Sequence, residues 1–300
     1  MGPKRSWLDF GALPTTHWQP SLRSSTMSPV TLSLIICGAV CLLTWIPSLF
    51  TGDSSWVDRM WSIIPVVYAW VFAGCAGLSD ARLNIMAILI TLWGIRLTLN
   101  FARRGGYSGY EDYRWAVLRA KMKPWQYQLF NIFFIVIFQN LLLMVIVFPM
   151  WTVTQNPSAG LGVGFDILMV LFLLALIGET VADQQQWNFQ KRKHAAIAAG
   201  QTPESRFCQS GLFKVSRHPN YFFELSQWWI VFLMGVAAAG SLWQWTGVGA
   251  LVLTGLFVGS TRFTEQITLS KYSEYASYQK RVSAVIPFFP RKSEVASATV

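Results

Sequence analysis

The stretch FFIVIFQNLLLMVIVFPMW, residues 133–151, decides the class of fold. A helix on the surface of a soluble protein shows polar side chains every three or four residues. This stretch offers almost none. Its length is close to the roughly 20 residues that an α-helix needs to cross a bilayer. The stretch therefore predicts a membrane-spanning helix and argues against a soluble all-helical protein.

Apolar runs of this kind recur along the whole chain. They lie at about residues 29–50, 62–79, 84–101, 126–151, 162–182, 221–239 and 242–260. The composition agrees, with 53% hydrophobic and only 13% charged residues. We expect an all-α, polytopic integral membrane protein with about seven transmembrane helices, and hence a lipid bilayer as its partner.

The chain shows no fixed-period repeat and no polar linker long enough to separate two domains. We therefore predict one membrane domain at 28–288. A polar segment at 1–27 without an apolar core reads as a disordered N-terminal tail, and 289–300 as a flexible C-terminal tail.

The net charge of +10 is concentrated in three loops, so it does not indicate a nucleic-acid partner. Basic residues crowd 102–124, 183–217 and 262–292, whereas 152–161 and 239–243 carry none. The positive-inside rule then places the C-terminus in the cytoplasm and, with seven spans, the N-terminus outside. Three basic residues precede the first span and favour a cytoplasmic N-terminus; they are Lys4, Arg5 and Arg23. We give more weight to the three larger basic loops, which place the N-terminus outside.

Cysteine and histidine usage predicts neither a disulfide framework nor a metal site. The four cysteines have no metal-ligand spacing, and three histidines are too few for a histidine-rich di-iron centre. Gly255 and Gly259 form a small-xxx-small pair in the last span, which predicts tight helix packing at that point.

The segment GLFKVSRHPNYFFELSQWW, residues 211–229, combines charged and amide groups with the start of an apolar run. Polar groups at the mouth of a membrane helix are costly unless they are used. Arg217 and His218 suggest a bound phosphate, although interfacial anchoring of the helix would also explain them. Because Pro219, which follows His218, suits a first helical turn, Asn220 and Glu224 should lie one turn apart on one face.

This segment resembles the carboxy-terminal half of the steroid 5-alpha-reductase-like family, in particular its DUF1295-type branch, which reads GL(W/F)xxSRHPNYFGE. Isoprenylcysteine carboxyl methyltransferase-like proteins share the RHPxY element and the tail that ends here in KRVSAVIPF, residues 280–288. The elements DRMWSI at 58–63, RRGGY at 103–107 and ADQQ at 182–185 resemble the reductase-like branch alone. The resemblance implies NADPH as the cofactor, with S-adenosylmethionine as the alternative.

The resemblance also implies a set of site residues. Glu179 and Asp183 are one turn apart at the inner end of a span, where two carboxylates need hydrogen-bond partners such as ribose hydroxyls or arginine. The implied cofactor-binding residues are Arg103, Arg104, Tyr107, Arg114, Glu179, Asp183, Arg217, His218, Asn220, Tyr221, Arg262 and Glu265. The implied catalytic residues are Asn100, Tyr68, Asn220 and Glu224.

The implied reaction is hydride transfer from NADPH to a carbon–carbon double bond of a sterol-like or enone lipid that enters from the bilayer. Steroid reductases use a Glu and Tyr pair on the substrate carbonyl. This chain has no Glu in its first three spans, and Asn100 stands where the Tyr is expected. Two other classes stay open, a membrane methyltransferase and a non-catalytic membrane protein. In a eukaryote we expect the endoplasmic reticulum membrane; the sequence does not predict the oligomeric state.

Overall fold

The computed structural model describes residues 27–109, 111–157 and 160–290, and in these residues every regular element is a helix. The elements are α1 Pro29–Thr51, α2 Trp56–Met60, α3 Ile64–Cys75, α4 Ala81–Arg103, α5 Tyr113–Ala120, α6 Pro124–Phe130, the π-helix η1 Asn131–Phe138, α7 Gln139–Val145, α8 Pro149–Gln155, α9 Val163–Ala198, the 3-10 helix η2 Gly211–Lys214, α10 Pro219–Ala239, the 3-10 helix η3 Trp245–Gly247, α11 Val248–Lys271 and α12 Tyr275–Arg281. The tails predicted at 1–27 and 289–300 lie almost entirely outside the described residues.

Six helical segments of the described chain are long and apolar enough to cross a membrane. They are Pro29–Thr51, Ala81–Arg103, Pro124–Gln155, Val163–Ala198, Pro219–Ala239 and Trp245–Lys271. The expected all-α, multi-pass membrane architecture is confirmed. The run at 62–79 differs from the other six, because it forms only the 12-residue helix α3.

Local backbone chemistry explains why α3 is short. Pro65 stands in the first turn of α3, where the lack of an N–H group is tolerated. The same proline prevents α2 and α3 from forming one continuous helix. At the other end, Gly77 and Leu78 both have positive φ angles, of 64° and 57°. Two left-handed residues in succession stop the helix. The chain then turns back into α4, whose first N–H groups Asp80 caps.

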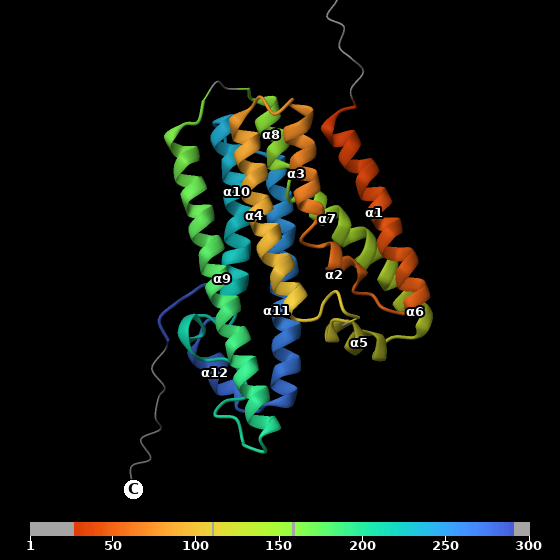
Figure 1. Ribbon diagram of the computed structural model, residues 1–300, viewed down its shortest axis with the longest axis vertical. Coiled ribbons are helices and arrows are strands. Elements are labelled where there is room, and N and C mark those ends of the chain that lie inside the picture. Colours follow the sequence, from red (N-terminus) through yellow and green to blue (C-terminus); the bar gives the residue numbers. More distant parts are fainter. Residues whose placement is uncertain (1–26, 110, 158–159, 291–300) are drawn as a thin grey trace, which may run out of the picture.

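The helices form an elongated bundle in which α1 begins at one end and α12 lies at the other (Figure 1). The basic loop around α5, the last turns of α9 and the segment around α12 all gather at the lower end in Figure 1. Residues 156–157, 160–162 and 240–244 lie at the upper end. Basic residues are therefore collected on one side of the bundle, as the loop charges predict. Which side faces the cytoplasm stays a prediction.

Gly249 allows a close contact between two helices, whereas the glycine pair predicted to do so does not. A Cβ added at Gly249 of α11 would lie 2.6 Å from the Val145 carbonyl oxygen and 2.7 Å from the Ile146 Cα. Gly255 and Gly259 have no atom within 4 Å of such a Cβ. The expectation that this pair marks tight packing is therefore wrong, since both residues border a cavity.

Candidate functional site

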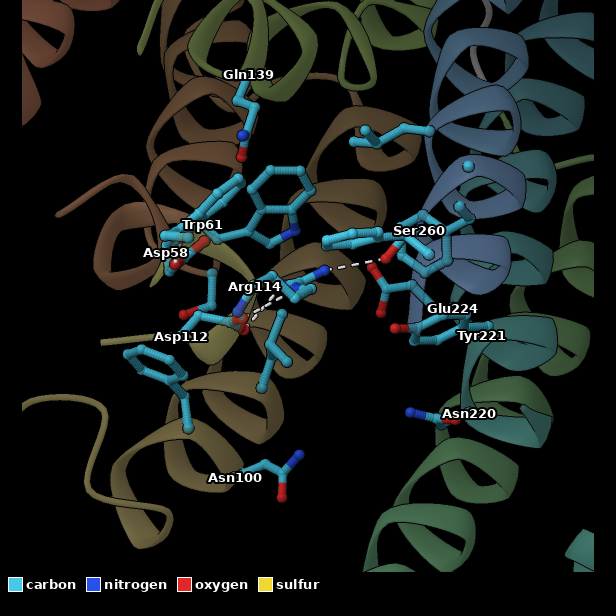
Figure 2. Close-up of a pocket in the computed structure, with 18 of the residues that line it drawn as sticks. Asp58, Trp61, Asn100, Asp112, Arg114, Gln139, Asn220, Tyr221, Glu224 and Ser260 are labelled. Atoms are coloured by element: carbon cyan, nitrogen blue, oxygen red, sulfur yellow. Dashed lines mark hydrogen bonds and ion pairs between the residues drawn. The ribbon is translucent and has the colours of Figure 1, made fainter. Parts of the chain in front are cut away.

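A cavity of about 670 Å³ lies between the helices and is lined by both polar and apolar side chains (Figure 2). Helices α4, α9, α10 and α11 form one side, and α2, α5, α6 and η1 close the other. Its polar lining residues are Asp58, Ser62, Asn100, Arg104, Asp112, Arg114, Gln139, Glu179, Asp183, Asn220, Tyr221, Glu224 and Ser260. The sequence predicted most of the cavity-lining residues that come from α4, α5, α9 and α10.

Arg96 of α4 organises the acidic wall of the cavity. Its Nη2 lies 2.7 Å from Glu179 Oε1 and 3.5 Å from Glu224 Oε2, and its Nη1 lies 2.7 Å from Asp183 Oδ2. The guanidinium of Arg96 thus compensates the charge of three carboxylates, whose burial without a partner would cost free energy in an apolar bundle. The sequence argument missed Arg96, although a single arginine in the middle of the run at 84–101 is the signal that points to an internal partner.

Neutral donors complete the hydrogen bonding of the carboxylates. Trp93 Nε1 donates to Glu224 Oε2 at 2.8 Å, and Trp228 Nε1 donates to Glu224 Oε1 at 2.9 Å. Gln227 Nε2 donates to Glu179 Oε2 at 2.7 Å. Glu224 is thus held between two indoles, and this geometry fixes its place on the wall.

Asp183 connects this network to the mouth of the cavity. It accepts a 2.7 Å hydrogen bond from Asn100 Nδ2, and Arg104 Nη2 lies 3.5 Å from its Oδ1. Asn100 Oδ1 accepts in turn from Arg103 Nε at 2.9 Å. The second donor group of Arg103 bonds the neutral Gln184 Oε1 at 2.8 Å. Arg104 lines the cavity and Arg103 lies next to it, outside the lining, and neither has a tightly held carboxylate of its own.

Asn220 and Tyr221 follow Pro219 on the first turn of α10, and both side chains face the cavity (Figure 2). The amide of Asn220 has no hydrogen-bond partner in the part of the chain that the structure describes. The Tyr221 ring stacks on His218 with centroids 5.1 Å apart. The sequence therefore placed the start of α10 and the orientation of its first turn correctly.

The opposite wall carries a second acidic and basic group. Arg114 makes a paired contact with Asp112, at 2.8 Å and 2.9 Å, and donates to Ser260 Oγ at 2.9 Å. Asp58 of α2 accepts from Trp115 Nε1 at 2.9 Å. Burial raises the pKa of the Asp58 carboxyl, against the weaker opposing effect of Arg114. Asp58 was quoted in the sequence only as part of DRMWSI and was not expected to line the site.

Aromatic rings also line the cavity. Phe130, Phe134 and Phe138 form a stacked ladder, with successive centroids 4.9 Å and 5.3 Å apart. The ladder runs along the π-helix η1, and π-helical turns occur frequently at functional sites. Gln139 follows directly and lines the cavity beyond the rings. An apolar surface of this kind suits a lipid better than a polar metabolite.

Arg217, His218 and Glu265 form a separate buried cluster, outside the cavity lining. Arg217 Nε and Nη2 bond Glu265 at 2.6 Å and 2.9 Å, and its Nη1 contacts the carbonyl oxygens of Gln279 and Val282. His218 Nε2 lies 3.0 Å from Glu265 Oε1. The phosphate site expected at Arg217 and His218 is not supported, because these donors are used within the protein. The cluster instead ties α10 to α11 and to the C-terminal segment.

Four further expected site residues also lie outside the cavity lining, among them Arg103, which directly precedes Arg104. Tyr68 is completely buried in the core between α1 and α3 and does not line the cavity. Tyr107 is exposed and donates a 3.1 Å hydrogen bond to the Arg59 carbonyl oxygen. Arg262 is exposed on α11. Each has a residue type that is common both in sites and at membrane interfaces, so the sequence could not separate the two roles.

Comparison with known proteins identifies the family. The family model described as "Protein of unknown function (DUF1295)" matches residues 44–282. The chain belongs to the DUF1295 family. It is also 37% identical over 279 residues to a Schizosaccharomyces pombe protein described as uncharacterized, with 88% of this chain and 80% of that protein covered. No solved structure matches the chain significantly. The DUF1295 match includes every element that lines the cavity.

Proposed function

We propose that this DUF1295 protein is an NADPH-dependent reductase of a carbon–carbon double bond in a sterol-like or other enone lipid. One observation carries the proposal. Residues that the reductase resemblance assigns to cofactor and catalysis come from four separate helices and surround one cavity, which aromatic rings also line. They are Asn100, Arg104, Arg114, Glu179, Asp183, Asn220, Tyr221 and Glu224.

The residues at the mouth fit a dinucleotide. Arg103 and Arg104 offer guanidinium groups whose closest partners are neutral amides or a carboxylate at 3.5 Å, so both retain capacity for phosphate oxygens. Asp183 Oδ1, whose nearest partner is Arg104 Nη2 at 3.5 Å, offers an acceptor that suits a ribose hydroxyl. Both oxygens of Glu179 are already bonded, by Arg96 and Gln227. Asn220 holds an unpaired amide on the wall, and an amide can both donate to and accept from a carboxamide.

The aromatic part of the cavity fits the substrate. The ladder of Phe130, Phe134 and Phe138 offers a flat apolar surface to a lipid body. Asp58 lies on the wall near Trp61 and Arg114 (Figure 2). Burial raises the pKa of its carboxyl and so favours the protonated form, which is the form that donates a hydrogen bond to a carbonyl oxygen.

NADPH, when bound, supplies the hydride. The chain's own residues orient the two ligands and hold a proton at the Asp58 carboxyl, and the rings of η1 exclude water from the apolar end. Asp58 thereby replaces the Glu and Tyr pair that the steroid reductases use. We place this activity in a multi-pass membrane protein, in the endoplasmic reticulum membrane if the source is a eukaryote.

Equilibrium binding of NADPH to the purified protein tests the proposal. Replacing Arg104 by alanine should weaken NADPH binding roughly tenfold or more, because a charge-assisted hydrogen bond contributes about 1.5–3 kcal/mol. Arg206→Ala is the matched control, since Arg206 is an exposed arginine outside the cavity lining. Its NADPH affinity should equal that of the wild type.

Binding of S-adenosylmethionine is measured on the same samples. Tight binding of S-adenosylmethionine without detectable NADPH binding would establish the methyltransferase alternative instead. Equal NADPH affinities of Arg104→Ala, Arg206→Ala and the wild type would move the phosphate site away from this mouth.

A further inference from the structure

Gln139 is a buried amide on the cavity wall that nothing in the protein uses. It is 4% exposed, and it lies near the middle of the apolar segment Pro124–Gln155. Its side chain has no hydrogen-bond partner among residues 27–109, 111–157 and 160–290. An unpaired amide in such surroundings costs about 1–3 kcal/mol, so its presence at this depth needs a reason.

The neighbouring residue shows what a structural amide looks like in this bundle. Asn140 Nδ2 donates to Val136 O at 2.8 Å and to Thr44 Oγ1 at 3.2 Å, and so joins α7 to α1. Asn140 is absent from the cavity lining, whereas Gln139 is part of it. Figure 2 shows the Gln139 amide directed from the wall into the cavity. Gln139 is therefore placed to contact a bound molecule.

The position of Gln139 defines which part of the ligand it would meet. Figure 2 places Gln139 at one end of the cavity and Asn100 and Asn220 at the other. The rings of Phe134 and Phe138 lie on the same wall just ahead of Gln139 in the chain. The cavity thus offers amide groups at both ends, and Trp61 and the Arg114–Asp112 pair lie between them (Figure 2).

We propose that Gln139 binds a neutral hydroxyl or keto group at the end of the lipid substrate that lies farthest from the cofactor. The proposal rests on the proposed reductase function and narrows its substrate class to elongated apolar molecules with a polar group at each end. An amide both donates and accepts, so it suits either a hydroxyl or a ketone. A charged group is disfavoured, because Gln139 brings no charge of its own and its neighbours on the wall are Phe134 and Phe138.

Two related steroids test this inference. The probes are testosterone, which carries an enone at one end and a hydroxyl group at the other, and its analogue without that hydroxyl group. Equilibrium dialysis against purified protein gives the two affinities. The wild type should bind testosterone roughly tenfold more tightly than the analogue, the factor that a hydrogen bond of about 1.4 kcal/mol produces.

Gln139→Met keeps the shape of the side chain and removes its hydrogen bonding. It should bind both probes with nearly equal affinity. Gln155→Met makes the same change at an exposed glutamine outside the cavity and should discriminate as the wild type does. Because Gln139 supports no other residue, Gln139→Met should also melt at the same temperature as the wild type or higher.

Several results would overturn the inference. They are equal affinities of the wild type for both probes, retained discrimination in Gln139→Met, a clear loss of stability in that variant, and failure of both steroids to bind. NADPH affinity is measured in parallel. If NADPH binds while the steroid results fail, only the role of Gln139 is wrong. If NADPH does not bind the wild type, the reductase function is wrong, whatever the relative affinities for the two steroids.

Discussion

Arg217 is held by two hydrogen bonds to Glu265 and by two backbone carbonyl oxygens of the C-terminal segment. The side chains of Arg217 and Glu265 are only 10% and 9% exposed. Removal of one partner of such a pair leaves an uncompensated buried charge, which costs about 3–5 kcal/mol. We therefore expect Arg217→Ala to lower the thermal stability of the detergent-solubilised protein strongly.

The double variant Arg217→Met with Glu265→Gln provides the comparison for this prediction. Without a charge left unpaired, it should melt above Arg217→Ala, and NADPH affinity per folded molecule should stay close to that of the wild type. A normally stable Arg217→Ala with greatly reduced NADPH affinity would instead restore the phosphate-binding role that the sequence suggested.

Residue type and local spacing predicted many of the cavity-lining residues. They did not predict the roles of charged residues whose ion-pair or hydrogen-bond partners lie far away in the sequence. Asn220 and Glu224 were predicted because a proline-started helix fixes which side its first turns present. Arg217 has the same local signal as a phosphate-binding arginine, and only the position of Glu265, far along the chain, shows otherwise. Arg96 and Asp58 were missed because their partners come from distant helices.

Helix α11 carries one glycine that packs against another helix and another glycine that lines the cavity. Gly249 approaches the backbone of α7 too closely for a methyl group, so Gly249→Ala should destabilise the protein by about 1–3 kcal/mol. Gly255 has open space in the same place and borders the cavity. Gly255→Ala should keep or slightly raise stability, since alanine favours a helix over glycine by about 1 kcal/mol.

Thermal unfolding and ligand binding of the two glycine variants distinguish these roles. A methyl group at Gly255 narrows the cavity, so Gly255→Ala should weaken probe binding while it unfolds like the wild type. Equal destabilisation by both substitutions would mean that Gly255 is a packing residue, as the small-xxx-small spacing first suggested.

The apolar runs predicted six of the spans well because each run is a continuous local signal. The short α3 was not predicted, because its run is apolar enough to suggest a full span. Pro65 and the left-handed pair Gly77 and Leu78 end it early. Helix α9 differs in the other direction: predicted to 182, it continues to Ala198. Polar residues such as those at 184–186 end a membrane run but do not end a helix.

For the whole molecule, the distribution of basic loops predicts that the lower end of the bundle in Figure 1 faces the cytoplasm. Single cysteines at half-buried Ser205 and exposed Ser273 on the lower end and at exposed Gln155 on the upper end test this in sealed vesicles. The native cysteines, including exposed Cys75, are first replaced by alanine. An impermeant reagent should label Gln155→Cys from the opposite side to the other two.

The sidedness prediction depends on the number of crossings between the labelled sites. Labelling of all three cysteines from one side would mean that the bundle does not cross the membrane along its long axis. Labelling of Ser205→Cys and Ser273→Cys from the outside would reverse the orientation and remove the site from cytoplasmic NADPH.

The contact between Arg217 and the C-terminal segment bears on how related genes are named. The RHPxY letters and the IPF tail occur together in reductase-like and methyltransferase-like proteins, and in this chain the two stretches bind each other. Arg217 contacts the carbonyl oxygens of Gln279 and Val282, and the His218 N–H donates to Ala284 O at 3.0 Å. Annotation that assigns an activity from these two motifs would therefore group proteins by a shared structural contact and not by their active-site residues. Residues that line the cavity, such as Asn100, are the better basis for comparing the proposed chemistry.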